Sequence, residues 1–313
     1  MLKVDNISFA YAEKKVIENL TLEVLPGSHV SIIGESGCGK STLLKLIYGI
    51  YDCDQGEITL DSELVRGPKF KLIPGEETIK YLAQDFGLMP YITVAENIGK
   101  YLSNVDKTAK QQRIKELLLL VGLSEYSSTK ADYLSGGQQQ RTALAMALAL
   151  QPKLLLLDEP FSQIDNFRTN VLRRAVYGYC KEHNITCIVA SHDSDDILPF
   201  ADQIVVLKNG EIIRKGTPIE VYNSPESIYT ASLFGEVNLI SSKFLKIDSS
   251  DETIPVYPHQ LVISTDGFEV IVQKSQFYGS HHLIHADYLG NTMLFDSDEE
   301  IPVGNRVTLA YKK

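Results

Sequence analysis

The chain has 313 residues, of which 44% are hydrophobic and 22% are charged, and its formal net charge is −10. This is the composition of a soluble globular protein, and an acidic chain without a lysine or arginine cluster argues against nucleic acid as the main ligand. The longest unbroken apolar run, residues 143–150, is far short of the ~20 residues that span a membrane. The first residues, MLKVDNISFAYA, have no signal-like apolar block, so we expect a cytoplasmic protein.

Strand patterns dominate the first part of the chain. Apolar residues alternate with polar ones over 20–24 and run into a Pro-Gly turn, which predicts a half-buried strand. The short apolar run 29–33 predicts a second strand that ends at Gly34.

Helical and strand patterns alternate further along. Residues 93–123 and 136–150 are expected to be helical. The runs 153–157 and 185–190 lack polar alternation, as do strands buried on both faces of a mainly parallel sheet. Asn209-Gly210 lies between two apolar stretches and predicts a tight hairpin.

The pattern changes near Gly235, after which strands follow one another without helices. Segments such as LVIS, FEVIVQ and RVTLAY alternate between turns, as in a small barrel or sandwich. The sequence therefore predicts an α/β domain over residues 1–235 and an all-β domain over 236–313. In the second domain, His281 and His285 share a strand face, but no third ligand lies nearby to complete a metal site.

A glycine-rich loop follows the strand predicted at 29–33. Residues 34–42 read GESGCGKST, which matches G-x-x-x-x-G-K-[ST] between a predicted strand and a predicted helix. That context disfavours the alternative of a glycine-rich turn with a chance lysine. Its glycines let backbone N–H groups point at phosphate oxygens, Lys40 neutralises the terminal phosphates, and the Ser41 hydroxyl is placed to ligate Mg²⁺. The residues expected to bind the nucleotide here are Gly34, Glu35, Ser36, Gly37, Cys38, Gly39, Lys40, Ser41 and Thr42.

Two carboxylates end a second buried strand, in the sequence LLLLDEP at 154–160. The carboxyl ends of strands are where open α/β sheets bind ligands. We expect Asp158 to hold Mg²⁺ through its water shell and Glu159 to accept the proton of an attacking water. A chance strand end with two acids is the alternative, which the phosphate-binding loop disfavours.

The stretch LSGGQQQR at 134–141 completes a set of motifs. With these motifs in this order, residues 2–235 resemble the ATP-binding subunit of an ABC transporter. The resemblance implies a P-loop NTPase core, with a RecA-like sheet and an antiparallel β subdomain, and a helical subdomain over about residues 86–150. The resemblance also implies further site residues. Tyr11 would stack on adenine and Val16 would contact the ribose, while Gln84 would bind Mg²⁺ and sense the membrane partner. Asp165 would belong to the D-loop, and His192 would be the switch histidine that contacts the γ-phosphate. Taken singly, each of these has an ordinary packing or solvent role as an alternative.

The resemblance also explains why the chain carries two glycine-rich motifs. It implies a head-to-tail homodimer in which the signature of one copy covers the ATP held by the other. Ser135, Gly136, Gly137 and Gln138 would then act in trans at a helix N-terminus, where N–H groups favour an anion. ATP would close the dimer and hydrolysis would open it.

Some positions depart from the family pattern. The third D-loop position is Ile164 rather than leucine, and Met146 stands where arginine is common. Neither is a phosphate ligand, so we expect activity to survive. Residues 66–81 differ from the short segment that usually links the early hairpin to the glutamine loop in this family, and we assign them no function. Residues 87–98 are the candidate groove for a membrane subunit, with packing of the helical subdomain as the alternative.

The cysteines Cys38, Cys53, Cys180 and Cys187 form no CxxC pair, so neither a zinc site nor a disulfide framework is expected. Cys38 lies in the phosphate loop at a helix N-terminus and close to Lys40, and both features favour the thiolate. We expect Cys38 to be a reactive thiol shielded by ATP, unless its side chain points into the protein.

The tail resembles the β-barrel (TOBE-like) regulatory extension of importer ATPases, which favours an importer. The implied partners are a second copy, two integral-membrane permease subunits and, indirectly, a solute-binding protein, with the chain on the cytoplasmic face of the inner membrane. Alternatives are the ATPase of an export complex and a soluble, non-transport ABC ATPase. The resemblance of the tail favours importers of ferric iron, polyamines or sulfate, and the sequence does not identify which of these solutes is transported.

Overall fold

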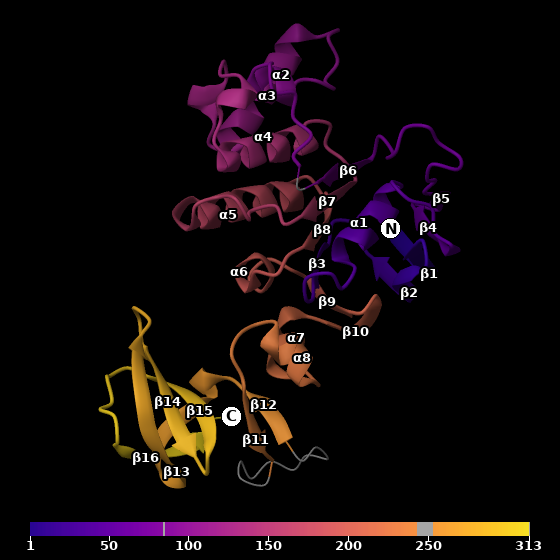
Figure 1. The fold of residues 1–313 in the computed structure, drawn as a ribbon. Helices are drawn as coiled ribbons and strands as arrows, with labels where there is room; N and C mark the ends of the chain where they lie inside the picture. The colour runs from indigo at the N-terminus through magenta and orange to yellow at the C-terminus, as the bar shows by residue number, and fades with distance from the viewer. Residues whose placement is uncertain (84, 243–252, 313) are drawn as a thin grey trace. The chain divides into compact units, whose positions relative to one another are not determined.

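The computed structural model describes residues 1–83, 85–242 and 253–312 (Figure 1). The chain divides into two compact units, Met1–Ile219 and Glu220–Lys313. The division falls within the short helix α7 (Pro218–Asn223), earlier in the chain than the expected boundary after residue 235. Among the described residues, no helix has the length and apolar character needed to cross a membrane.

A six-stranded sheet of order β10-β9-β3-β8-β7-β6 forms the centre of the first unit. Strands β9, β3, β8, β7 and β6 are parallel, and β10 is antiparallel to β9. Strands β3, β7 and β8 are buried along their whole length, as was predicted for β7 and β8 from their unbroken apolar runs. The strands are β3 (His29–Ile33), β6 (Ile79–Leu82), β7 (Leu154–Asp158), β8 (Thr186–Ala190), β9 (Gln203–Lys208) and β10 (Glu211–Gly216).

The hairpin predicted at Asn209-Gly210 joins β9 to β10. Asn209 has φ 49° and Gly210 has φ 84°, so both central residues are left-handed, as a type I′ turn requires. A side chain at Gly210 would also meet the carbonyl oxygen of Val16, 2.3 Å from its Cβ.

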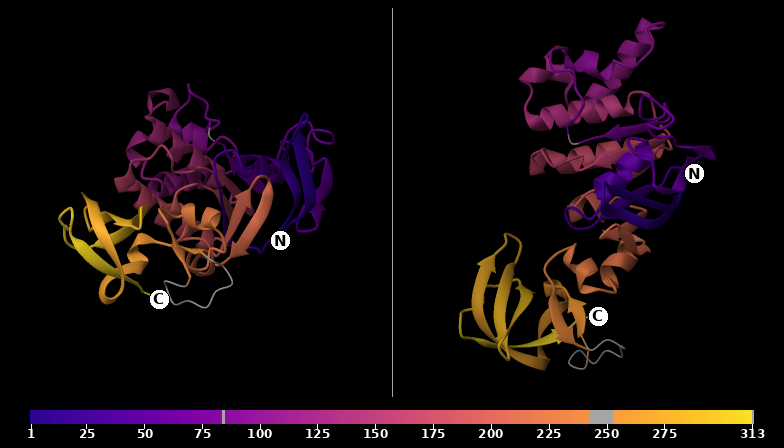
Figure 2. Two further views of the ribbon diagram at one scale, coloured as in Figure 1. Left: turned by 60° about the horizontal axis from the view of Figure 1, so that its bottom comes forward. Right: turned by 45° about the vertical axis from the view of Figure 1, so that its right-hand side comes forward.

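A second, four-stranded antiparallel sheet of order β2-β1-β4-β5 lies near the N-terminus, in indigo in Figures 1 and 2. Its apolar faces share one buried cluster with β3 and helix α1 (Lys40–Tyr48). As a result, the turn between β1 and β2 lies beside the first residues of α1. The strands are β1 (Leu2–Tyr11), β2 (Lys14–Val24), β4 (Gln55–Leu60) and β5 (Glu63–Leu64).

The segment 93–123, which was expected to be helical, contains two helices separated by a break. Helix α2 (Val94–Ile98) begins at a capping box between Thr93 and Glu96. It ends at Gly99, and α3 (Lys107–Leu120) begins after the cap Asp106. The helical prediction at 136–150 is confirmed by α4 (Gly136–Leu148). Two 3-10 turns, Ser124–Tyr126 and Ala131–Tyr133, lie between α3 and α4.

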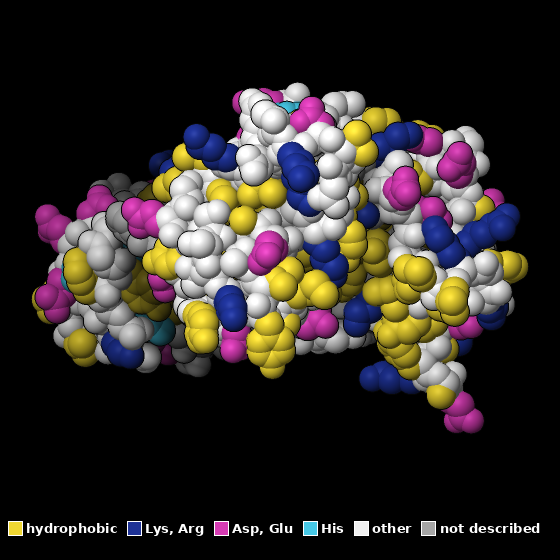
Figure 3. Space-filling view, turned by 90° about the horizontal axis from the view of Figure 1, so that it is seen from above, with side chains coloured by type: hydrophobic (Ala, Val, Ile, Leu, Met, Phe, Trp, Pro, Cys, Tyr) yellow, Lys and Arg dark blue, Asp and Glu magenta, His cyan; other side chains and the backbone are white. Residues whose placement is uncertain are grey.

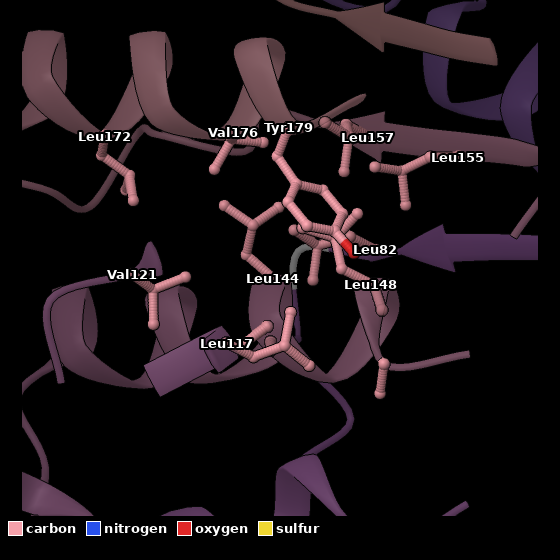
Figure 4. Packing of buried hydrophobic residues seen from close by; sticks show 14 of the residues in the cluster. Leu82, Leu117, Val121, Leu144, Leu148, Leu155, Leu157, Leu172, Val176 and Tyr179 are labelled. Carbon is pink, nitrogen blue, oxygen red and sulfur yellow. The ribbon is translucent and has the colours of Figure 1, made fainter. Parts of the chain in front are cut away.

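The central sheet has a hydrophobic core on each face. Leu154 and Leu156 of β7 belong to the cluster that contains α1, whereas Leu155 and Leu157 belong to a second cluster. Figure 4 shows this second cluster, which joins the strands to α4 and to α5 (Asn166–Glu182). The short helix α6 (Ser194–Ile197) follows β8. This cluster packs α4 and α5 against β7 and β8.

The second unit is mainly antiparallel β structure. Two strands pair at its start, β11 (Asn238–Ser241) and β12 (Thr253–Val256), after the helix α8 (Ile228–Ser232). A four-stranded sheet follows in the order β15-β14-β13-β16. Its strands are β13 (Leu261–Phe277), β14 (His282–Tyr288), β15 (Asn291–Ser297) and β16 (Arg306–Tyr311), with a 3-10 turn at Pro258–Gln260.

Candidate active site

The glycine-rich loop joins β3 to α1, as the motif predicted. Gly37 and Gly39 have φ of 82° and 113°, which side-chain-bearing residues rarely adopt. The Lys40 ammonium lies inside the loop and donates to the carbonyl oxygens of Gly34, at 2.6 Å, and Glu35, at 3.1 Å. Lys40 is buried, so its charge is focused on the concave side of the loop.

A pocket of about 320 Å³ opens beside this loop. The predicted adenine and ribose contacts Tyr11 and Val16 meet the loop there, although they come from the β1–β2 hairpin. The hydroxyl oxygens of Tyr11 and Thr42 lie 3.3 Å apart. Glu159 of the β7 end also reaches the pocket wall, so the base candidate faces the phosphate loop. The lining residues are Tyr11, Lys14, Val16, Ser36, Gly37, Gly39, Lys40, Ser41, Thr42 and Glu159.

The predicted magnesium ligands Ser41 and Asp158 are in contact. The Ser41 hydroxyl donates to Asp158 Oδ1 at 3.0 Å, and the hydroxyl of Tyr81 donates to Oδ2 at 3.1 Å. Asp158 is the last residue of β7 and is buried. Hydroxyl and carboxylate oxygens suit Mg²⁺, which binds hard oxygen donors, so this donor set fits the metal. Gln84, the third predicted ligand, lies outside the described residues.

Glu159 and His192 form a hydrogen-bonded pair, with 2.8 Å between Glu159 Oε1 and His192 Nδ1. This bond and the charge of Glu159 raise the pKa of His192 above its usual value. Glu159 has φ 51°, an uncommon left-handed conformation for a residue with a side chain. Its N–H donates to Ala190 O at 2.9 Å, which ties the turned backbone to β8. The two residues are 33 positions apart in the chain and meet because β7 and β8 are neighbours.

The signature forms the N-terminus of α4. Ser135 is the N-cap, and a capping box joins it to Gln138, with Gln138 N–H on Ser135 Oγ at 3.3 Å and Ser135 N–H on Gln138 Oε1 at 2.9 Å. A Cβ on Gly137 would lie 2.8 Å from the carbonyl oxygen of Gln163, so only glycine fits without a shift. Ser135 and Gly136 are exposed and do not line the pocket beside the phosphate loop.

Gln140 is a site residue that the sequence did not single out. Its side chain is 2% exposed and joins three motifs. Gln140 Nε2 donates to Glu159 O at 2.9 Å, and the N–H of Gln163, in the D-loop, donates to Gln140 Oε1 at 3.0 Å. It thereby holds the backbone of the base candidate and of the D-loop against α4. Its place in LSGGQQQR was a signal, but its partners could not be read from the sequence.

Arg173 is a second residue that the sequence did not single out. It is buried in α5 and pairs with the buried Asp196 and with Asp193, the latter at 2.6 Å. It also donates to Asn170 Oδ1 at 3.0 Å, and its guanidinium lies 5.7 Å from the ring centre of Phe161. Because Asp193 follows His192 directly, Arg173 anchors the switch loop to α5.

The D-loop departure Ile164 is a buried residue of the core cluster that contains α4 and α5. A β-branched side chain is therefore accommodated there by packing. Asp165 is the N-cap residue of α5 and is exposed, without a side-chain hydrogen bond to the cap. Met146 lines a groove on the helical side of the first unit.

This groove has a volume of about 390 Å³ and is also lined by Phe86 and by Gly87, the first residue of the segment predicted to receive a membrane subunit. Within that segment, Val94 and Ile98 are fully buried and pack the helical core. Met89 and Tyr91 are exposed, at 45% and 77%. Residues 87–98 thus combine a packing part with an exposed part.

The unusual segment 66–81 carries exposed apolar side chains, with Phe70, Leu72 and Ile73 at 70%, 97% and 74% exposure. Ile73 also lines the groove. Figure 3 looks onto the face that carries α2 and α3, where hydrophobic side chains gather in patches between charged ones.

The expectation of a reactive thiol at Cys38 is wrong. Its side chain points into the protein, is buried, and lies against Gly34, where a Cβ would come within 2.7 Å of Cys38 Sγ. Burial raises the pKa of the thiol and outweighs the opposing charge of Lys40. Cys38 therefore contributes its backbone to the loop and its side chain to the core.

In the second unit, His281 and His285 take separate polar partners. His281 Nε2 lies 3.6 Å from Asp296 Oδ1, and His285 Nε2 lies 2.7 Å from Gln276 Oε1. Among the described residues, no three metal-ligating side chains form a group.

Comparison with known proteins identifies the family. Residues 17–162 match the ABC transporter family. The chain is 38% identical to the sulfate/thiosulfate import ATP-binding protein CysA of Gloeobacter violaceus, over 83% of this chain and 76% of the relative. It is 35% identical to the Fe(3+) ions import ATP-binding protein FbpC 2 of Rhodococcus jostii, over 98% and 91%. A Thermotoga maritima spermidine/putrescine import ATP-binding protein, PotA, is 34% identical, over 79% and 67%.

Solved structures agree with this assignment. A dimeric bacterial ABC transporter cassette matches 70% of this chain and 99% of its own, with a TM-score of 0.63 and 29% identity. Its post-hydrolysis form bound to ADP and Pi matches with a TM-score of 0.62. The predicted fold class, a P-loop NTPase core followed by an all-β part, is confirmed. The chain belongs to the ABC transporter family, as an importer-type ATP-binding subunit and an ATPase coupled to transport.

Proposed function

We propose that the chain hydrolyses ATP with Glu159 as the general base. The observation that carries this is the hydrogen-bonded pair of Glu159 and His192 at the wall of the pocket beside the phosphate loop. The Glu159 carboxylate accepts the proton of the attacking water, and His192 orients that carboxylate and faces the γ-phosphate. Lys40 and the loop N–H groups bind the phosphates, and Tyr11 and Val16 hold the adenosine.

Mg²⁺ neutralises phosphate charge when it is bound. We assign Ser41 as its direct ligand and Asp158 as a partner through water, and their contact in the structure supports that pairing. Gln84 completes the set in our proposal.

The substitution Glu159→Gln tests the base, because it keeps the shape and hydrogen bonding of the side chain and removes its basicity. Steady-state ATP hydrolysis should fall ~10²–10⁴-fold, while ATP binding persists and the closed dimer accumulates. Glu182→Gln, at the exposed end of α5, is the matched control and should hydrolyse ATP at the parent rate. Hydrolysis by Glu159→Gln at the control rate rejects the assignment.

We infer that the working form is a head-to-tail homodimer in which Ser135, Gly136, Gly137 and Gln138 approach ATP bound to the other copy. The exposure of Ser135 and Gly136 and their place at a helix N-terminus support this role. Asp165 is the exposed N-cap residue of α5, and we place it at the dimer interface.

Mixing Ser135→Arg with Lys40→Ala tests action in trans. A mixed dimer has one intact composite site and one doubly damaged site, so size-exclusion chromatography with ATP should show mixed dimers. Each variant alone should remain monomeric. A Ser135→Arg protein that dimerises like the parent contradicts the trans role.

We propose that the dimer binds two integral-membrane subunits on the cytoplasmic face of the inner membrane and, through them, serves a solute-binding protein. Relatives named for the import of sulfate, Fe(3+) and spermidine/putrescine support a small solute as cargo. We assign residues 1–235 to the ATP-binding domain and 236–313 to a TOBE-like regulatory domain. Co-purification of the tagged chain from membranes with two membrane proteins is the expected result, and recovery only as a soluble dimer contradicts it.

A further inference from the structure

The side chain of Tyr81 contacts both the nucleotide site and the groove on the helical side of the first unit. It lies on β6, next to β7, and its strand position is paired with Leu156. Its ring lines the 390 Å³ groove together with Tyr48 and Met146. Its hydroxyl donates to the carboxylate of Asp158, the last residue of β7.

The hydrogen bonds of Asp158 show what this contact does. Ser41 occupies Oδ1 at 3.0 Å and Tyr81 occupies Oδ2 at 3.1 Å, so both carboxylate oxygens have a donor. Asp158 is 4% exposed, and little water can replace a lost donor. A buried carboxylate with one oxygen unpaired would turn to find another partner, which would move Oδ1 away from Ser41.

The ring of Tyr81 is held in place for this role. Tyr48, the last residue of α1, packs against it with 5.6 Å between ring centres. This packing fixes the direction of the Tyr81 hydroxyl toward Asp158.

We propose that Tyr81 is a positioning residue for the metal step, which holds Asp158 in the orientation that faces Ser41 and so sets the affinity of the site for Mg²⁺. This inference rests on the proposed role of Asp158. Tyr81 lies three positions before Gln84 in the chain. Through Tyr81, the wall of the groove is joined by a hydrogen bond to the nucleotide site.

The test is ATP hydrolysis by Tyr81→Phe as a function of Mg²⁺ concentration. Loss of the hydroxyl should raise the Mg²⁺ concentration for half-maximal rate by ~10-fold, the lower end of the effect of removing a partner of a metal ligand. Saturating Mg²⁺ should restore the rate. Binding of a fluorescent ATP analogue in EDTA should be unchanged, because no phosphate contact is removed. Tyr48→Phe, which removes a hydroxyl from the same groove and leaves the Asp158 hydrogen bonds intact, is the control and should keep the parent Mg²⁺ curve.

The outcomes separate this inference from the function on which it rests. If Asp158→Asn hydrolyses ATP like the parent, the proposed metal role is wrong and so is this inference. If Asp158→Asn is inactive but Tyr81→Phe has the parent Mg²⁺ curve, only the positioning role is wrong. A Tyr81→Phe protein that binds nucleotide poorly in EDTA and is not restored by Mg²⁺ shows a structural role instead, and also overturns the inference.

Discussion

Arg173 supports the switch loop, and its removal should destabilise the first unit strongly. Arg173→Met keeps the length of the side chain and leaves Asp196 buried without its cation. Breaking a buried ion pair from one side costs ~3–5 kcal/mol. Each kcal/mol lowers Tm by ~2–4 °C in a domain of about this size, so we expect a fall of roughly 6–20 °C.

Lys181→Met in the same helix is the matched control. Lys181 pairs with Asp202 at 2.5 Å, but the two side chains are 47% and 46% exposed. An exposed pair contributes at most ~1 kcal/mol, so its loss should shift Tm by only a few degrees. Circular dichroism during heating measures both variants.

A third variant isolates the cause. Adding Asp196→Asn to Arg173→Met removes the uncompensated charge and should recover part of the lost Tm. The reasoning is refuted if Arg173→Met lowers Tm no more than Lys181→Met does, or if the double variant is no more stable than Arg173→Met.

Three further predictions follow from the site. The pKa of His192 is raised in the folded chain by its pairing with Glu159. The stability that this pairing contributes is therefore fully present at pH values below the usual histidine pKa of ~6.5. It is lost as the pH rises through the raised pKa. Glu159→Gln should therefore lower Tm more at pH 6 than at pH 8, and an equal loss at both pH values contradicts the pairing. Gln140→Leu should reduce ATP turnover by ~10–100-fold through misplacement of the Glu159 backbone, with nucleotide binding retained; parent turnover would show that the bridge is dispensable. Cys38 should resist brief maleimide treatment of the native chain and react after unfolding, because its thiol is buried with a raised pKa; peptide mapping checks this, and rapid native labelling at Cys38 would place the thiol on the surface.

Local patterns were sufficient where the chemistry lies within one short segment. The phosphate loop, the strand ending in Asp158 and Glu159, and the signature at the start of α4 were all predicted from contiguous residues, and the structure places each on the expected element. The Asn209-Gly210 hairpin was predicted for the same reason, because its turn depends on two neighbouring residues. The helical expectation over 93–123 is met by α2 and α3, but the break between Gly99 and Asp106 was not predicted.

Cys38 shows where local reasoning ends. The helix N-terminus and Lys40 were visible in the sequence and predicted a lowered thiol pKa. The burial that raises the pKa depends on the direction of the side chain into a core shared by two sheets, which neighbouring residues do not determine.

The sequence by itself determined the family, the order of the motifs and the residue types that the chemistry needs, because these depend on short-range spacing. Only the tertiary structure decided which partners those residues have. Tyr81 meets Asp158 across 77 positions, Arg173 meets Asp196 across 23, and Gln140 meets Glu159 across 19. Such contacts follow from the order of strands in the sheet and the packing of α4 and α5 upon it, and a hydrogen bond between distant residues leaves no periodic signal in the chain.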